Sequence, residues 1–200
     1  MDPHAEYFAL ARECLLEPPT PALVEALGAR ARRGPQEPIH PDFDRGWERW
    51  RRFFAARQTP AACADAAEAH RALLSDPLSP RLQPYASWYR DGHRLGEALV
   101  GLRGFLAQWR LAADRARFRD LEDHAAFLFD CLYRLRELEA SEGPSWTAAY
   151  GACLHEHVLP WMPRFLQDLE REDATLACGG FYGGLAQVLL GILALEASSR

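Results

Sequence analysis

Apolar residues recur at steps of three and four along almost the whole chain, and prolines separate one such repeat from the next. This spacing puts the apolar side chains of each segment on one face of a helix, whereas a proline ends or bends a helix. The clearest repeat is an aromatic stripe formed by Trp47, Trp50, Phe53 and Phe54. The pattern predicts an all-α fold, a single helical-bundle domain of about eight to ten helices.

Local signals set the expected helix boundaries. Thr20 and Thr59 each stand before a proline, which is typical of a helix N-terminus. Residues 34–41 and 76–92 are rich in proline and predict loops, and a loop as long as the second is often functional. The predicted helices cover residues 3–16, 21–33, 42–54, 60–75, 94–109, 120–135, 145–158, 161–169 and 181–195.

Composition narrows the function classes. Hydrophobic residues make up 48% of the chain, which is enough for a packed core. The formal net charge of −5 disfavours a nucleic acid partner and favours a basic peptide. All 23 basic residues are arginine, so lysine chemistry such as a Schiff base or a phosphate-loop lysine is excluded.

Three further observations predict a cytoplasmic protein. The five cysteines are scattered without a CxxC pair, which suits a reducing compartment. The chain opens with Met-Asp-Pro rather than with a basic patch and an apolar run, so we expect no signal peptide. The longest apolar run, residues 185–195, is interrupted by Gln187 and Gly191, so we expect no stable membrane insertion.

Two short stretches stand out against the helical background. Residues 84–89 read Pro-Tyr-Ala-Ser-Trp-Tyr and could form an apolar platform, and residues 120–124 read Asp-Leu-Glu-Asp-His. Asp120 could cap the following helix, with the other two acids favoured by the helix dipole. Repulsion among three carboxylates nevertheless costs free energy unless a cation relieves it, and a partner's guanidinium could do so.

These stretches supply most of the candidate site for a peptide. The aromatic stripe is more typical of a core, but indoles are also common at the rim of a peptide-binding site. The candidate peptide-binding residues are Tyr85, Ser87, Trp88, Tyr89, Asp120, Glu122, Asp123, His124, Trp47 and Trp50.

Catalytic and metal sites are weaker interpretations. Ser87, Asp123 and His124 are the residue types of a hydrolase triad, but the glycines of a nucleophile elbow are missing. His155 and His157 stand two residues apart and would point to different faces of a helix, so they could not chelate a metal together. We therefore expect no catalytic residues and no bound metal.

The chain resembles the TorD/DmsD/NarJ-type chaperones of redox-enzyme maturation. Residues 84–89 resemble the family's Pro-Tyr-x-Ser-x-Tyr segment, and residues 120–124 resemble its Glu-Pro-x-Asp-His hinge motif. The hinge motif departs from the family pattern at Asp120 and Leu121 and keeps Asp123 and His124. The opening helix before Pro18 and the helix–break–helix at residues 157–165 also look like those of the family.

The resemblance implies a chaperone without enzymatic activity and without a cofactor of its own. It would bind the twin-arginine signal peptide of the apo form of a molybdopterin-containing oxidoreductase and assist cofactor insertion before export. It also implies lobes at about residues 1–112 and 123–200, a hinge at 113–122, and a monomer or domain-swapped homodimer. The alternatives are a small serine hydrolase using Ser87 and His124, and a structural assembly subunit of a redox complex.

Overall fold

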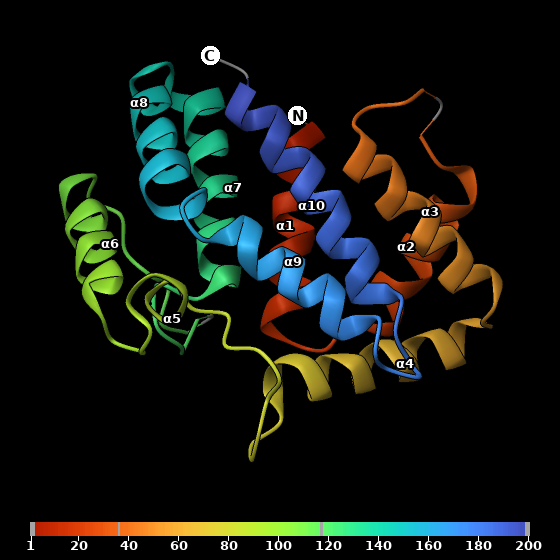
Figure 1. Cartoon of the computed structure of the whole chain (residues 1–200). Coiled ribbons are helices and arrows are strands. Elements are labelled where there is room, and N and C mark those ends of the chain that lie inside the picture. Colours follow the sequence, from red (N-terminus) through yellow and green to blue (C-terminus); the bar gives the residue numbers. More distant parts are fainter. Residues whose placement is uncertain (1–2, 36, 117, 199–200) are drawn as a thin grey trace. The chain divides into compact units, whose positions relative to one another are not determined.

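The computed structural model describes residues 3–35, 37–116 and 118–198, and within these ranges it is helical, without named strands (Figure 1). The all-α prediction of eight to ten helices is confirmed, because ten α-helices and two π-helical segments lie in the described ranges. They are α1 (Pro3–Leu16), α2 (Pro21–Arg33), α3 (Pro41–Ala55), α4 (Thr59–His70), η1 (Arg71–Ser75), α5 (Ala86–Asp91), α6 (Glu97–Gln108), α7 (Ala125–Glu142), α8 (Ser145–Ala152), η2 (Cys153–Val158), α9 (Met162–Asp173) and α10 (Phe181–Ser198).

The observed N-termini of the helices show which of the predicted capping residues were correct. The Thr20 hydroxyl accepts a hydrogen bond from the N–H of Leu23 at 3.3 Å, so the predicted cap of α2 is confirmed. Thr59 is instead the first residue of α4, and the capping position belongs to Gln58, which makes no side-chain cap bond. The predicted helix start at Asp120 is also wrong, because α7 begins at Ala125.

The predicted loop at residues 76–92 contains a short helix, α5. A helix of six residues is too short to show a clear apolar period, which is why the sequence pattern missed it. Gly92 ends this helix in the left-handed conformation (φ 79°), and its N–H donates to the carbonyl oxygen of Trp88.

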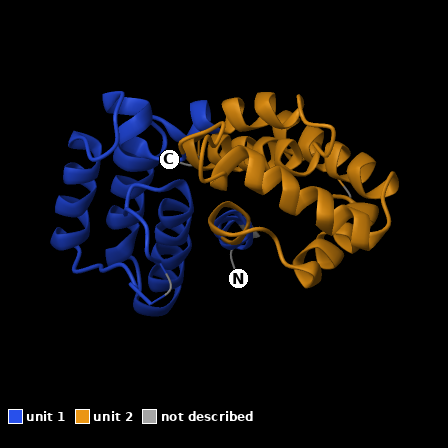
Figure 2. Cartoon of the chain, turned by 90° about the horizontal axis from the view of Figure 1, so that it is seen from below, with its two compact units in different colours: residues 1–12, 84–165 blue, residues 13–83, 166–200 orange. Residues whose placement is uncertain are grey.

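The chain forms two compact units, each assembled from separated stretches of sequence (Figure 2). Unit 1 contains residues 1–12 and 84–165, and unit 2 contains residues 13–83 and 166–200. This grouping differs from the lobes expected from the sequence, and a hinge at residues 113–122 stays a prediction.

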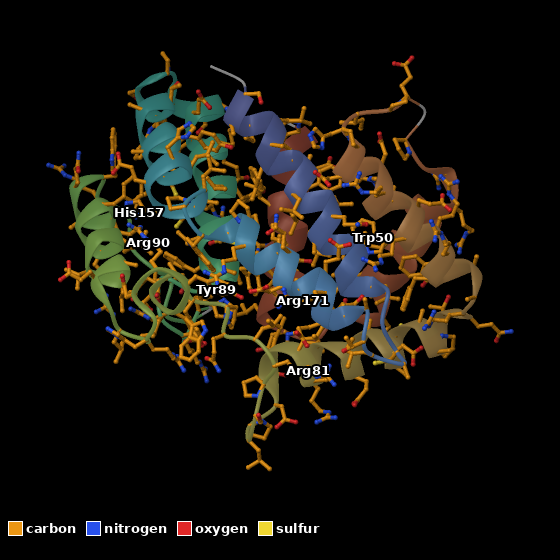
Figure 3. All side chains as sticks on the ribbon, viewed as in Figure 1. Trp50, Arg81, Tyr89, Arg90, His157 and Arg171 are labelled. Carbon is orange, nitrogen blue, oxygen red and sulfur yellow. The ribbon has the colours of Figure 1, made fainter. Side chains whose placement is uncertain are left out.

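Unit 2 is built on close packing between α3 and α10. A methyl group at Gly46 would lie 2.6 Å from the backbone nitrogen of Val188, so the two helices meet almost backbone to backbone. The aromatic stripe of α3 lies in this core, and the indole N–H of Trp50 donates to the carbonyl oxygen of Phe181 at 2.8 Å (Figure 3). The rings of Phe53 and Phe54 pack edge-on against Phe181.

The packing of α10 against α3 accounts for the apolar character of α10. By length and composition α10 could cross a membrane, so its apolar character extends beyond the run of residues 185–195, and the absence of stable membrane insertion stays a prediction. However, 67% of its apolar window is buried inside the fold, as is usual for the core helix of a soluble protein.

Unit 1 packs the start of α1 and the helices α5 to α8 together. Phe8 of α1 stacks on Phe129 of α7 with ring centroids 6.0 Å apart, and the Arg12 guanidinium donates to the Asp130 carboxylate at 2.7 Å. α5 packs against α6, and α7 against α8. This unit contains both stretches that the sequence singled out.

Candidate functional site

The two singled-out stretches are paired with each other through their backbones. The N–H of Ala86 donates to the carbonyl oxygen of Asp123 at 2.9 Å, and the N–H of Ala125 donates to that of Pro84 at 2.8 Å. Tyr85 and His124 thereby form an isolated antiparallel bridge. Residues 84–89 and 120–125, here called the paired segments, are therefore one site, which the sequence pattern did not reveal.

The buried carboxylate of Asp123 connects the two paired segments. Oδ2 of Asp123 accepts a hydrogen bond from the backbone N–H of Ser87 at 2.9 Å, and both residues are fully buried. Oδ1 of Asp123 and Oγ of Ser87 have no hydrogen-bond partner among the residues that the structure describes. Asp123 thus holds the paired segments together from inside.

His124 also has a structural task. Its Nδ1 accepts a hydrogen bond from the N–H of Ala126 at 3.1 Å and so caps the N-terminus of α7. This explains the wrong helix start, because the capping role expected of Asp120 belongs to His124. Since Ser87 Oγ makes no hydrogen bond to His124 in the described structure, the proton relay of a hydrolase triad is not formed.

Tyr85 is occupied by neighbours within unit 1. Its ring lies 5.2 Å from that of His124, and its hydroxyl donates to Oδ2 of Asp120 at 2.8 Å. Arg94 covers the ring at 4.0 Å and also pairs with Asp120 at 3.5 Å. Burial, together with the hydrogen bond to Asp120, raises the pKa of Tyr85. The phenol is therefore a packed side chain rather than an open platform.

The chain supplies its own cations for the acidic stretch. Oε2 of Glu122 accepts two hydrogen bonds from the Arg103 guanidinium, at 3.1 and 2.9 Å, and Oε1 accepts one from Arg115. Burial alone would raise the pKa of Glu122, but hydrogen bonds and these two guanidinium groups hold it below its ordinary value. Charge repulsion is relieved internally, and not only by a partner as the sequence suggested.

Sequence reasoning missed these arginines. Arg115 stands seven residues before Glu122, so its proximity could have been noticed. Arg94 and Arg103 reach the site only because the chain turns back after α6, and a turn of this kind leaves no periodic signal.

Apolar side chains remain exposed within residues 84–89 and shortly after them in the chain. Trp88 is 46% exposed on α5, whereas Tyr89 is half-buried and packs on Trp161 and Phe165 at 5.6 and 5.9 Å. Leu95, two residues before α6, and Val100, in the first turn of α6, are 65% and 68% exposed. We call Trp88, Leu95 and Val100 the exposed apolar set.

Leu95 is unusual in its backbone conformation as well as in its exposure. Its φ of +64° lies in the left-handed region, which is uncommon for a residue other than glycine. Backbone strain of this kind often accompanies functional sites, so it is a reason to include Leu95 in the candidate site. Neither Leu95 nor Val100 was among the residues predicted from the sequence.

Trp47 and Trp50 belong to the core of unit 2. Trp50 is fully buried, and Trp47 is buried while lining a hollow of about 250 Å³ beside Glu48 and Arg51. Their place in the core agrees with the usual meaning of an aromatic stripe. A role for either indole at the rim of a peptide site stays a prediction.

His157 of η2 is used in packing. The ring of His157 lies 5.1 Å from that of Phe105, and burial lowers the pKa of His157. Nearby, Nη1 of Arg90 on α5 donates to the carbonyl oxygen of Glu156 at 3.1 Å (Figure 3). Within the described ranges, no three His, Cys, Asp or Glu side chains gather in a way that could hold a metal ion.

Comparison with known proteins places this geometry in a family. Residues 36–167, more than half of the chain and including both paired segments, match the family described as nitrate reductase delta subunit. The chain is also 32% identical over 124 residues to a protein named chaperone protein TorD from Aeromonas salmonicida (strain A449). That match covers 58% of this chain and 53% of the relative, so the chain spans about half the length of this curated relative. The chain belongs to the TorD/NarJ family of maturation chaperones.

Proposed function

We propose that the protein is a cytoplasmic chaperone that binds the N-terminal twin-arginine signal peptide of an apo-molybdoenzyme. It would hold that precursor while the molybdenum cofactor is inserted and before export. Family membership supports the chaperone class. The observation that carries the binding role is the exposed apolar set, which begins within the paired segments at Trp88.

The apolar set suits the hydrophobic stretch of a signal peptide. Trp88 stands on α5, Leu95 stands just before α6, and Val100 stands in the first turn of α6, which packs against α5. Covering a few large apolar side chains contributes about 1.5–3 kcal/mol each, less the cost of ordering the peptide. We expect an affinity near the micromolar range.

The acidic residues suit the arginines of the same peptide, but they divide into two roles. Asp120 and Glu122 are carboxylates that bind guanidinium groups, since they pair with arginine side chains of unit 1, and a client arginine would take the place of one of these. Asp123, Ser87 and His124 hold the paired segments and cap α7, so they act on binding through the fold.

This division decides which variant tests the site. Replacing Asp123 or His124 disturbs the fold as well as any contact with a peptide. Trp88→Ala changes an exposed side chain instead, and its matched control is Trp146→Ala on α8, a half-buried tryptophan of the same unit.

The test is a calorimetric titration with a synthetic peptide that carries an arginine pair followed by an apolar stretch. We expect Trp88→Ala to weaken binding about tenfold, which corresponds to about 1.4 kcal/mol. Trp146→Ala should bind like the wild type. If both variants bind like the wild type, the apolar contact lies elsewhere.

The cofactor and the oligomeric state follow from the same proposal. The molybdenum cofactor belongs to the client enzyme, and the chaperone acts as a monomer or a domain-swapped homodimer. Co-purification with the client that persists after cofactor insertion would favour a structural subunit over a transient chaperone.

A further inference from the structure

Glu122 is occupied by two guanidinium groups from its own chain. Arg103 reaches it from α6, and Arg115 reaches it from the segment between α6 and α7. Each guanidinium contacts a different carboxylate oxygen, Arg103 on Oε2 and Arg115 on Oε1. The carboxylate therefore already holds a pair of arginines.

The exposures show which side of this cluster faces solvent. The side chain of Glu122 is only 8% exposed, whereas those of Arg103 and Arg115 are 51% and 56% exposed. The two arginines cover the carboxylate and are themselves open to water. With one acid against two guanidinium groups, the cluster presents net positive charge, although its stretch of sequence is acidic.

A client arginine cannot reach Glu122 while this arrangement persists. A nearly buried carboxylate that loses its cations is strongly destabilised, so it does not wait empty for a partner. An incoming guanidinium has to replace one that is already there, and the chemical gain of that exchange is small because the two groups are alike.

We propose that Arg103 and Arg115 are internal competitors that occupy the Glu122 carboxylate until a client's arginine pair displaces them. This proposal rests on the proposed function, because it takes the arginines of the client peptide as the incoming groups. It makes the arginine contact weak by itself. A peptide gains net affinity only if it also covers the exposed apolar set, so the exchange selects for peptides that carry both features.

A purely supporting role for the two arginines predicts the opposite result. If Arg103 and Arg115 only brace the fold, removing either one leaves peptide affinity equal or lower. If they compete with the peptide, removing either one uncovers an acceptor and raises affinity.

The experiment is a titration of the full chain with the same arginine-pair peptide. We expect Arg103→Gln and Arg115→Gln each to bind it about three- to tenfold more tightly than the wild type. Arg134→Gln is the matched control, because it removes one charge from an exposed ion pair with Glu137 in the same unit. Its change reports the effect of net charge alone and should be smaller.

Two further arms isolate the carboxylate. Arg103→Lys keeps the charge but gives up the two-point contact, so it should also raise affinity, without any change in net charge. Adding Glu122→Gln to Arg103→Gln should abolish the gain. The same peptide with lysines in place of its two arginines should gain less from Arg103→Gln, since an ammonium group cannot form the paired contact.

The outcomes separate this inference from the proposed function. Wild-type binding with no gain in Arg103→Gln, Arg103→Lys and Arg115→Gln beyond that of Arg134→Gln overturns internal competition and leaves signal-peptide binding intact. If neither the wild type nor Arg103→Gln binds any arginine-pair peptide, the proposed function is overturned. Internal competition is then judged from guanidinium chloride added at concentrations below those that unfold the protein. A shift of the Arg103 Nε resonance towards that of a solvent-exposed arginine supports exchange at Glu122, and an unmoved resonance overturns it.

Discussion

The backbone N–H of Ser87 donates a hydrogen bond of 2.9 Å to Oδ2 of Asp123, 36 residues further along the chain. Both residues are buried, so this bond is made without competition from water. It follows two backbone hydrogen bonds that pair the same segments, one donated by Ala125 and one donated by Ala86. Asp123 of the hinge-like motif thus holds together the paired segments of unit 1.

Removing this hydrogen bond should destabilise the fold. Asp123→Ala leaves the buried N–H of Ser87 without its acceptor, at a cost of about 1–3 kcal/mol in the free energy of unfolding. Asp123→Asn keeps an oxygen at the same place and should lose less. Urea denaturation measures both. An alanine variant as stable as the wild type would show that the bond contributes nothing.

The cap on α7 can be tested by exchanging one capping residue for another. His124→Ala removes the acceptor for the N–H of Ala126 and should cost about 1 kcal/mol. His124→Asn can restore a capping oxygen and should recover most of that loss. Thermal and urea unfolding report the difference, and equal losses in the two variants would contradict a capping role.

Unit 2 should weaken as the pH falls, because of His70. Burial lowers the pKa of this residue to about 4 from 6.5, and its ring lies against Tyr182 with Nδ1 3.1 Å from the Ser75 hydroxyl. The unfolded chain therefore binds more protons than the folded chain between these two pKa values. The His70 contribution is complete above pH 6.5 and is lost as the pH falls towards 4.

The expected loss from His70 between pH 7 and pH 5 is about 2 kcal/mol. Urea unfolding at both pH values measures it in the wild type and in His70→Gln, whose slope with pH should be shallower. His93→Gln, which alters an exposed histidine, is the control and should leave the slope unchanged. Identical slopes in all three proteins would show that burial of His70 is not the cause.

Two glycine substitutions should have opposite effects. At Gly46 an added methyl would lie 2.6 Å from the backbone of α10, so Gly46→Ala should cost at least about 1–3 kcal/mol. At Gly104, on the exposed face of α6, it would meet nothing within 4 Å, and Gly104→Ala should gain about 0.5–1 kcal/mol. Midpoints of urea unfolding compare the two, and a destabilised Gly104→Ala would refute the assignment of its face.

The helices were predictable because their causes are local. The stripe from Trp47 to Phe54 repeats with the helical period, and Thr20 caps α2 within three residues of itself. The choice of His124 over Asp120 as the cap of α7 was not predictable. It depends on the bridge to Tyr85, which fixes where the helix can begin.

The site was predictable in its residues but not in its arrangement. The sequence identified the paired segments separately, and their hydrogen bonds join residues that are far apart in the chain. It also treated Glu122 as a free acid, whereas Arg103 and Arg115 neutralise it. Such long-range pairs leave no periodic trace, and a single sequence therefore reveals the parts of this site without their contacts.

The packing of α3 on α10 has a consequence for biosynthesis. Trp50 and the carbonyl group that accepts its indole N–H are 131 residues apart, so a ribosome adds those residues before the aromatic face of α3 can be covered. At about 5–20 residues per second, that interval lasts roughly 7–26 seconds. During translation, α3 of this proposed chaperone therefore lacks the cover of α10. Its aromatic side chains are then open to aggregation or to binding by a general chaperone.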